Sequence, residues 1–457
     1  MKRLSILLLG VTFLFSPLLS EAQETNHTCG MQAMKEALLQ ANPQLETVMK
    51  QVQEQQVKSA YEFKAAHANA ALKTTAAAPI PVVFHIVLNE AQIAQLGGAA
   101  GIKKRVDSQI IVLNRDFNAR NSDSVRIPAN FKPLYANTGI EFGLARRKAD
   151  GSATDGYEII VTTESGFEMQ SSGSVGFKGA KYAATNGADA WDPAKYLNVW
   201  VINPFSNGSA ASILGLCVPP SFSAYGIPQA EFGLVLNYGA FGKRTLYADY
   251  YISGINAGRT LTHEVGHYFE LRHIWGDDDG QCPSDSRGSD DGIADTPPQS
   301  EASYGCPTYP KFDNCSATGD GIMFMNYMDY VNDACMMMFT KDQAAMMQSN
   351  VQPGTNSYSL TQHPELLQYP TGIATAMVDE AALTVYPNPT TGVVYLTNTN
   401  AAIKDVKVYN VVGNVVFNGS SVNDKNFTID LSGYPKGVYT VQCSTANGIA
   451  TKRIVLQ

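Results

Sequence analysis

Residues 263–273 of this 457-residue chain read HEVGHYFELRH. On a helix, His263 and His267 differ by only ~40° around the axis and ~6 Å along it, so both imidazoles can bind one ion. Glu264 follows the first histidine, beside the open side of such an ion. A helix continuing to His273 would carry it ~240° around and ~9 Å along, out of reach. The run therefore predicts a helix that stops and a chain that turns back.

Three neutral imidazoles are a typical ligand set for a catalytic zinc ion, and they leave a fourth position for water. On the metal the pKa of that water falls to about 7, and Glu264 is placed to accept its proton. The alternative is three unrelated histidines. With seven histidines in the chain, HExxH is expected by chance roughly 0.004 times, so the alternative is weak.

The composition limits the class of protein. Hydrophobic residues make up 44% and charged residues 16%, which is typical of a globular chain, and the length favours two or three domains. The net charge of −8 lacks the positive field on which nucleic-acid binding depends. We therefore expect no nucleic-acid partner.

The first residues predict export. Lys2 and Arg3 precede an apolar run, residues 4–19, and then the small-x-small site Ser20-Glu21-Ala22, which together indicate a signal peptide over residues 1–22. The run is shorter than the ~20 apolar residues that span a bilayer, and no later run approaches that length, so no transmembrane segment is expected. Export also allows cysteines to oxidise.

The rest of the chain divides into four segments. Residues 23–76 contain an amphipathic helical pattern at 45–52 and are predicted to be a propeptide, or alternatively a flexible spacer. Residues 77–355 mix strands and helices, which favours an α+β domain. Its last helix is predicted to open at Thr340 with Gln343 completing a capping box. An apolar pattern predicts an earlier helix over 102–117, and the predicted strands include PIPVVFHIVL, YLNVWVINP and SILGLCVP. Residues 356–380 form a linker, and the short alternating strands of 381–457 favour a small all-β, immunoglobulin-like sandwich.

The run at 263–273 resembles the extended zinc motif HExxHxxGxxH of the metzincin metallopeptidases, most closely the pappalysin branch, which includes the cytophagalysin- and ulilysin-like enzymes. The resemblance extends from Pro79 to about Val351, and NYMDY at 326–330 resembles the Met-turn of that branch. It implies that Met328 lies beneath the zinc and that Tyr330 hydrogen-bonds the oxyanion. It also implies a catalytic domain with a twisted sheet, helices and an active-site cleft. The protein would be a secreted zinc endopeptidase, made as a latent zymogen, that cleaves proteins or peptides.

One residue departs from the pattern. Glu270 stands where the family has glycine, which allows the left-handed backbone conformation that begins the return turn. Glutamate in that conformation costs on the order of 1 to 3 kcal/mol. The departure motivates a competing hypothesis, a non-catalytic binding or adhesion protein that retains a degenerate metzincin fold.

All seven cysteines carry expectations. Spacing alone leaves three pairings open for the four between the zinc motif and the last helix. The pappalysin resemblance selects Cys282–Cys315 and Cys306–Cys335. Relatives also carry a Cys-Gly element like Cys29-Gly30, so we hypothesise that Cys29 is a fourth zinc ligand that keeps the zymogen latent. Cys217 and Cys443 are expected to be buried thiols.

Two further sites follow from the same resemblance. Seven aspartates between residues 277 and 295 repel one another unless a cation or solvent neutralises them. A calcium site there would use the carboxylate of Asp291 and the main-chain oxygens of Asp290, Ile293 and Thr296, whereas a solvated loop is the alternative. Related peptidases select a basic residue after the cut with an acid ahead of the last cysteine, which makes Asp333 a weak specificity candidate.

The tail resembles the C-terminal sorting domain of the type IX secretion system of the Bacteroidetes. The resemblance rests on VYPNPTTGVVYL, VYNVVGNVV and LSGYPKGVYTVQC. It implies that the secretion machinery is a partner and that the product is exported through the periplasm of such a bacterium to the cell surface or beyond. The alternative is a carbohydrate- or matrix-binding sandwich.

Overall fold

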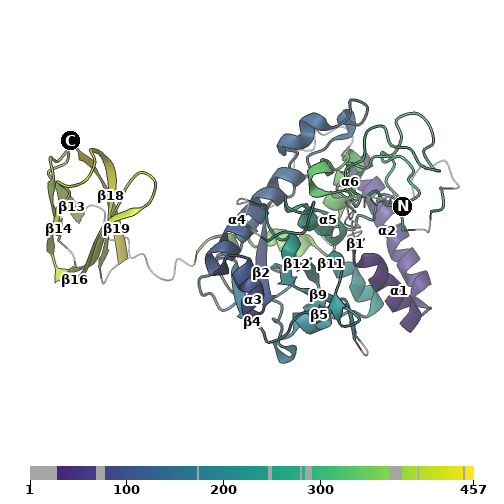
Figure 1. The fold of residues 1–457 in the computed structure, drawn as a ribbon, viewed down its shortest axis with the longest axis horizontal. Coiled ribbons are helices and arrows are strands. Elements are labelled where there is room, and N and C mark those ends of the chain that lie inside the picture. Colours follow the sequence, from purple (N-terminus) through teal and green to yellow (C-terminus); the bar gives the residue numbers. More distant parts are fainter. Residues whose placement is uncertain are drawn as a thin grey trace, which may run out of the picture. The chain divides into compact units, whose positions relative to one another are not determined.

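The computed structural model describes residues 28–67, 78–171, 174–244, 250–277, 280–283, 291–369, 383–399, 401–445 and 448–457 (Figure 1). The chain forms two compact units, one of residues 1–144 with 156–364 and one of 145–155 with 365–457. The predicted signal peptide lies outside the described residues. Within the described ranges no helix has the length and apolar character needed to cross a membrane.

A mixed seven-stranded sheet is the centre of the first unit. Its central strands are continuous apolar runs, buried on both faces, because helices and loops cover both sides. Only β11 and β12 pair antiparallel. The order along the sheet is β1 (Thr28–Cys29), β11 (Ile213–Val218), β12 (Gly233–Asn237), β8 (Leu197–Ile202), β2 (Ile80–Leu88) and β3 (Phe142–Leu144), and β4 (Tyr157–Val161) also pairs with β2.

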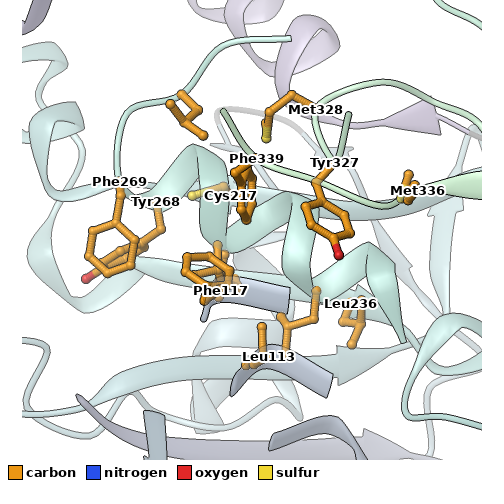
Figure 2. Close-up of a cluster of buried hydrophobic side chains, with 14 of the residues drawn as sticks. Leu113, Phe117, Cys217, Leu236, Tyr268, Phe269, Tyr327, Met328, Met336 and Phe339 are labelled. Atoms are coloured by element: carbon orange, nitrogen blue, oxygen red, sulfur yellow. The ribbon is translucent and has the colours of Figure 1, made fainter. Parts of the chain in front are cut away.

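Two helices build the core beside this sheet. Helix α4 (Gly98–Phe117) buries Leu113 and Phe117 along one apolar stripe, as the sequence predicts for 102–117. Helix α5 (Arg259–Tyr268) is buried along its whole length and contacts α4, β11 and β12. Figure 2 shows Phe117 near Phe339 and Tyr327, with Met328 nearby. The metal-binding motif therefore stands on a fully packed helix.

The half of the unit after α5 has little regular structure and is held by disulfides. Cys282 is bonded to Cys315 and Cys306 to Cys335, which are the pairs that the resemblance implies. Helix α6 (Lys341–Ser349) begins at Thr340 with the predicted capping box, in which Gln343 is the partner. The unit also contains short elements, among them α3 (Glu90–Gln95), β5 (Phe167–Glu168), β6 (Gln170–Ser171), β7 (Ser174–Val175), β9 (Pro204–Ser206), β10 (Ser209–Ala210) and the 3-10 helices η5 (Pro220–Tyr225) and η8 (Asp333–Cys335).

The segment predicted to be a propeptide forms two helices that pack on the rest of the unit. Helix α1 (Met31–Ala41) was not predicted, and α2 (Leu45–Ala66) extends well beyond the amphipathic stretch at 45–52. Met34 is buried with Leu216 and Trp200 in one core cluster. Helix α2 lies beside α6, at the right of Figure 1. Both helices are amphipathic, and α1 buries Met34 and Leu38 against the larger domain.

The second unit contains the predicted sandwich. Two antiparallel sheets share one core, to which both contribute alternate residues such as Val394, Ile429, Val406 and Val441. One sheet has the order β13 (Leu383–Tyr386), β14 (Val393–Asn398), β17 (Asn426–Asp430). The other has the order β16 (Val415–Asp424), β15 (Ile403–Tyr409), β18 (Gly437–Thr445), β19 (Gly448–Leu456).

Candidate active site

Three histidine side chains meet at one point in the first unit. The Nε2 atom of His267 lies 3.1 Å from the Nε2 atom of His263 and 3.1 Å from that of His273. All three residues are buried. The turn predicted after the helix is present, because α5 ends at Tyr268 and Glu270 has a φ of 72°. The structure therefore brings the third histidine back to the first two.

The other ring nitrogen of each histidine has a hydrogen-bond acceptor. Nδ1 of His263 and of His267 lie 2.7 Å from the carbonyl oxygens of Tyr327 and Leu271, and Nδ1 of His273 lies 2.7 Å from Oδ1 of Asp277. Each Nδ1 therefore carries the proton, and each Nε2 presents a lone pair to the common point.

The protonation of the cluster fits a metal ion. Burial, followed by the nearby His273, lowers the pKa of His263 to about 3, and the same two causes hold the pKa of His267 well below its usual value. Neutral imidazoles are what metal ligation requires. Three lone pairs facing one another at 3.1 Å repel unless a cation lies between them. These residues fit a zinc ion.

Glu264 lies beside this cluster in a space that a glycine provides. A Cβ atom on Gly215 of β11 would lie 2.5 Å from Oε1 and 2.6 Å from Cγ of Glu264. The carboxyl group is buried, and burial raises its pKa to about 8 although the bond from Cys29 opposes the shift. A carboxyl group with a raised pKa can exchange a proton near neutral pH.

The Met-turn residues lie beneath and beside the histidines. Gly266 leaves room for Met328, because a Cβ atom at that glycine would lie 2.5 Å from the methionine sulfur. Ile274, next to the third histidine, donates its backbone N–H to the carbonyl oxygen of Met328 at 3.3 Å. The hydroxyl oxygen of Tyr330 lies 3.0 Å from Nε2 of His273. Met328 thus packs against the motif helix and Tyr330 lies beside the third histidine, while the roles that the resemblance implies for them stay predictions.

Cys29 reaches the same point from the N-terminal segment. Strand β1 pairs in parallel with β11, and Gly30 donates its N–H to the carbonyl oxygen of Gly215 at 2.8 Å. Cys29 and the three histidines offer four ligand atoms within 4.8 Å of one another. Burial and the Glu264 carboxylate raise the pKa of the Cys29 thiol, so a thiolate here is stable only against a cation.

Two predicted groups lie elsewhere. The Asp291 carboxylate accepts hydrogen bonds from the Ile293 N–H at 2.9 Å and the Thr296 hydroxyl at 3.0 Å, and Asp290 lies outside the described residues. Calcium in this loop stays a prediction. Asp333 is buried under the start of α5, where its Oδ2 atom accepts the Ala257 N–H at 2.6 Å. The free cysteines Cys217 and Cys443 are buried, as expected.

Sequence reasoning missed three residues that shape the site. Asp277 was counted among the acidic residues of the loop, whereas the structure places it on His273. Its position four residues after that histidine was an available signal. Gly266 lies inside the motif itself. Gly215 left no sequence signal, because its importance comes from a strand that is distant in the chain.

The fold and the site together match those of the metzincin class of metallopeptidases. Residues 181–352 match the family model of peptidase M43, described as Pregnancy-associated plasma protein-A, and residues 384–457 match a model described as Secretion system C-terminal sorting domain. The chain belongs to the pappalysin family of metzincins and carries a C-terminal sorting domain.

Solved structures and curated relatives agree with this membership. Mature mirolysin of Tannerella forsythia, in complex with a cleaved peptide, is 38% identical with a TM-score of 0.55, and the match covers 64% of this chain and 99% of that one. A promirolysin mutant of the same organism is 34% identical with a TM-score of 0.61, covering 75% and 99%.

The curated relatives are named extracellular metalloproteases. The protein from Colletotrichum graminicola is 29% identical over 282 residues, which cover 61% of this chain and 78% of that one. The protein from Arthroderma otae is 36% identical over 152 residues, which cover 33% and 48%. The chain thus spans about half the length of the first curated relatives it matches. The sorting domain and the relatives' names indicate export to the cell surface or the extracellular space, as predicted.

Proposed function

We propose that this protein is a secreted zinc endopeptidase, made as a latent zymogen, that hydrolyses peptide bonds of proteins. The observation that carries the proposal is the convergence of three Nε2 atoms, in which that of His267 lies 3.1 Å from each of the other two, with Glu264 beside them. The relatives' names add support. No comparison supports the competing hypothesis of an adhesion protein.

The residues have distinct roles in this proposal. A zinc ion held by the three imidazoles supplies Lewis acidity, which acidifies water and polarises the peptide carbonyl. Glu264 accepts a proton from the attacking water and donates it to the departing amine. Tyr330 donates its hydroxyl hydrogen to the oxygen on which negative charge develops. Met328 supports the histidines from below.

The substrate takes the edge of β11. In the structure this edge is occupied by β1, in which Thr28 is opposite Ile213 and Cys29 is opposite Gly215. When β1 leaves, a row of unpaired backbone donors and acceptors is exposed, and an extended peptide can pair with it. The scissile bond then lies where Cys29 lay, above the histidines.

Latency follows from the same geometry. Cys29 occupies the fourth ligand position and its sulfur lies 3.5 Å from Oε2 of Glu264, so it occupies the site of water and contacts the base.

We assign residues 1–22 to the signal peptide, 23–76 to the propeptide, 77–355 to the catalytic domain, 356–380 to the linker and 381–457 to the sorting domain. The partner of the sorting domain is the type IX machinery. Calcium near Asp291 and a specificity role for Asp333 belong to the same proposal.

One experiment tests the function. The full-length protein is processed by an external protease that removes the propeptide and is then given a denatured protein as substrate. We expect degradation that a zinc chelator abolishes. Glu264→Ala should lower turnover by at least about a hundredfold while elemental analysis still finds one zinc per chain. Undiminished turnover in Glu264→Ala, or no degradation by processed protein that contains zinc, would reject the proposal.

A further inference from the structure

A cavity of about 140 Å³ lies between the predicted propeptide and the metal centre. His267 lines it, so the cavity reaches one of the histidines of the site. The propeptide side is formed by residues of α1 and α2. The other side consists of the η5 segment, with Phe222 and Tyr225, and the return turn, with Glu270 and Leu271. Removal of the two helices would open this cavity as a pocket beside the cleavage site.

Glu270 is one of the acidic side chains that line this pocket. Its Oε2 atom accepts one hydrogen bond from Nε2 of Gln56 in α2 and one from the Ser221 hydroxyl at 3.1 Å. The residue has a φ of 72°, which costs a non-glycine residue on the order of 1 to 3 kcal/mol. A glycine would avoid that cost, so the side chain needs a use that offsets it. The hydrogen bonds point to a use in binding.

The charges around the cavity are complementary across the interface. The walls that remain after the propeptide leaves carry two acidic side chains, Glu270 and Asp277, and one basic side chain, Arg272. The propeptide brings Lys35 and the amide of Gln56 to the same cavity. The catalytic side thus carries more acidic than basic side chains beside its apolar surface, and the propeptide places the N–H donors of Lys35 and Gln56 there.

We propose that Glu270 is a specificity-determining residue of the processed enzyme, a proposal that rests on the function proposed above. Its carboxylate receives a substrate side chain that is long and ends in an N–H donor, namely lysine, arginine or glutamine. The apolar stem of that side chain lies against Phe222, Tyr225 and Leu271. In the zymogen Gln56 of α2 holds this place.

Peptide binding tests the proposal without turnover. The full-length protein carrying Glu264→Ala is processed by an external protease. Its binding of peptides is then titrated by fluorescence anisotropy. The peptides differ at a single residue, which is varied in turn at each of three positions on either side of the cleavage site. At one position lysine and glutamine should bind about tenfold more tightly than norleucine, and glutamate more weakly. Adding Glu270→Gln should reduce the lysine-to-norleucine ratio to about one, and Glu270→Lys should reverse the preference toward glutamate.

The controls separate the subsite from folding and from catalysis. Glu301→Gln removes a carboxylate from a different pocket and should keep the ratio. Glu270→Gly removes the side chain and also the backbone strain, so a lost preference in this variant is no folding defect. A lysine preference that persists in Glu270→Gln and Glu270→Gly, or its absence from the parent, overturns the proposal. If the Glu264→Ala protein binds selectively but processed wild type never cleaves, only the proposed peptidase function is contradicted. If processed wild type cleaves but the lysine preference is absent, only the subsite is contradicted.

Discussion

At the scale of single residues, the position of the proposed base depends on the absence of a side chain at Gly215. In Gly215→Ala the new methyl group overlaps the Oε1 and Cγ atoms of Glu264, so the carboxylate must move away from the histidines. We expect peptide hydrolysis to fall by about a hundredfold with zinc content unchanged, because general-base catalysis contributes roughly that factor. Gly179→Ala is the matched control, since its Cβ atom meets Phe167 only at 3.6 Å. Full activity in Gly215→Ala would show that Glu264 has room elsewhere.

Lys181 provides a pH-dependent prediction. Its Nζ atom is buried, donates to the Glu231 carbonyl oxygen at 2.7 Å, and lies 5.2 Å from the Trp200 ring. Burial lowers the pKa of Lys181 to about 8, although Glu231 opposes the shift. Between pH 8 and 10.5 the unfolded chain therefore binds a proton that the folded chain does not, and this group's contribution to stability rises with pH.

The measurement compares wild type with Lys181→Met. Across that pH range the free energy of unfolding of wild type should rise relative to the variant by up to about 3 kcal/mol. Urea unfolding followed by tryptophan fluorescence at several pH values gives the difference, in which the other titrating groups cancel. A difference that does not change with pH would mean that Lys181 remains charged in the folded protein.

How much of the site could be predicted depended on how local each residue's role is. His263, His267 and Glu264 follow from helix geometry, and Glu270 was expected in the left-handed region where the structure has it, at a φ of 72°. Gly215 was invisible because its neighbour Glu264 is 49 positions away and the contact exists only after the sheet has formed. Burial of polar groups such as Lys181 likewise depends on packing that no local pattern encodes.

At the scale of secondary-structure elements, the proposed cysteine switch depends on β1, which places Cys29 beside the three histidines. Cys29→Ala removes the fourth ligand while the hydrogen bond from Gly30 to Gly215 can persist. We expect unprocessed Cys29→Ala to hydrolyse a small fluorogenic peptide at least about tenfold faster than unprocessed wild type, because water can then reach the metal. Cys217→Ala, which removes a buried thiol from β11, should remain latent. Equal latency in both variants would contradict the cysteine switch.

The elements themselves differ in how well the sequence predicts them. Helix α6 was predicted from its capping box, and the strands β2, β8 and β11 from continuous apolar runs. Helix α1 was missed because its stripe of Met34 and Leu38 spans few turns and is stable only on the surface of the larger domain. The pairing of β1 with β11 joins residues nearly two hundred positions apart, which hydrophobic periodicity does not reveal.

At the scale of the whole molecule, the two units have separate hydrophobic cores, so we predict two unfolding transitions. All three tryptophans, Trp191, Trp200 and Trp275, belong to the first unit. Their fluorescence therefore follows that unit alone, while calorimetry follows both.

A ligand that binds only the folded state stabilises it, by about 4 kcal/mol at a thousand times its dissociation constant. A zinc chelator should thus lower the fluorescence midpoint by several degrees and leave the other calorimetric transition in place. A single transition that the chelator shifts as a whole, or a fluorescence midpoint that it does not change, would contradict the prediction that zinc binds the three histidines of an independently folding unit.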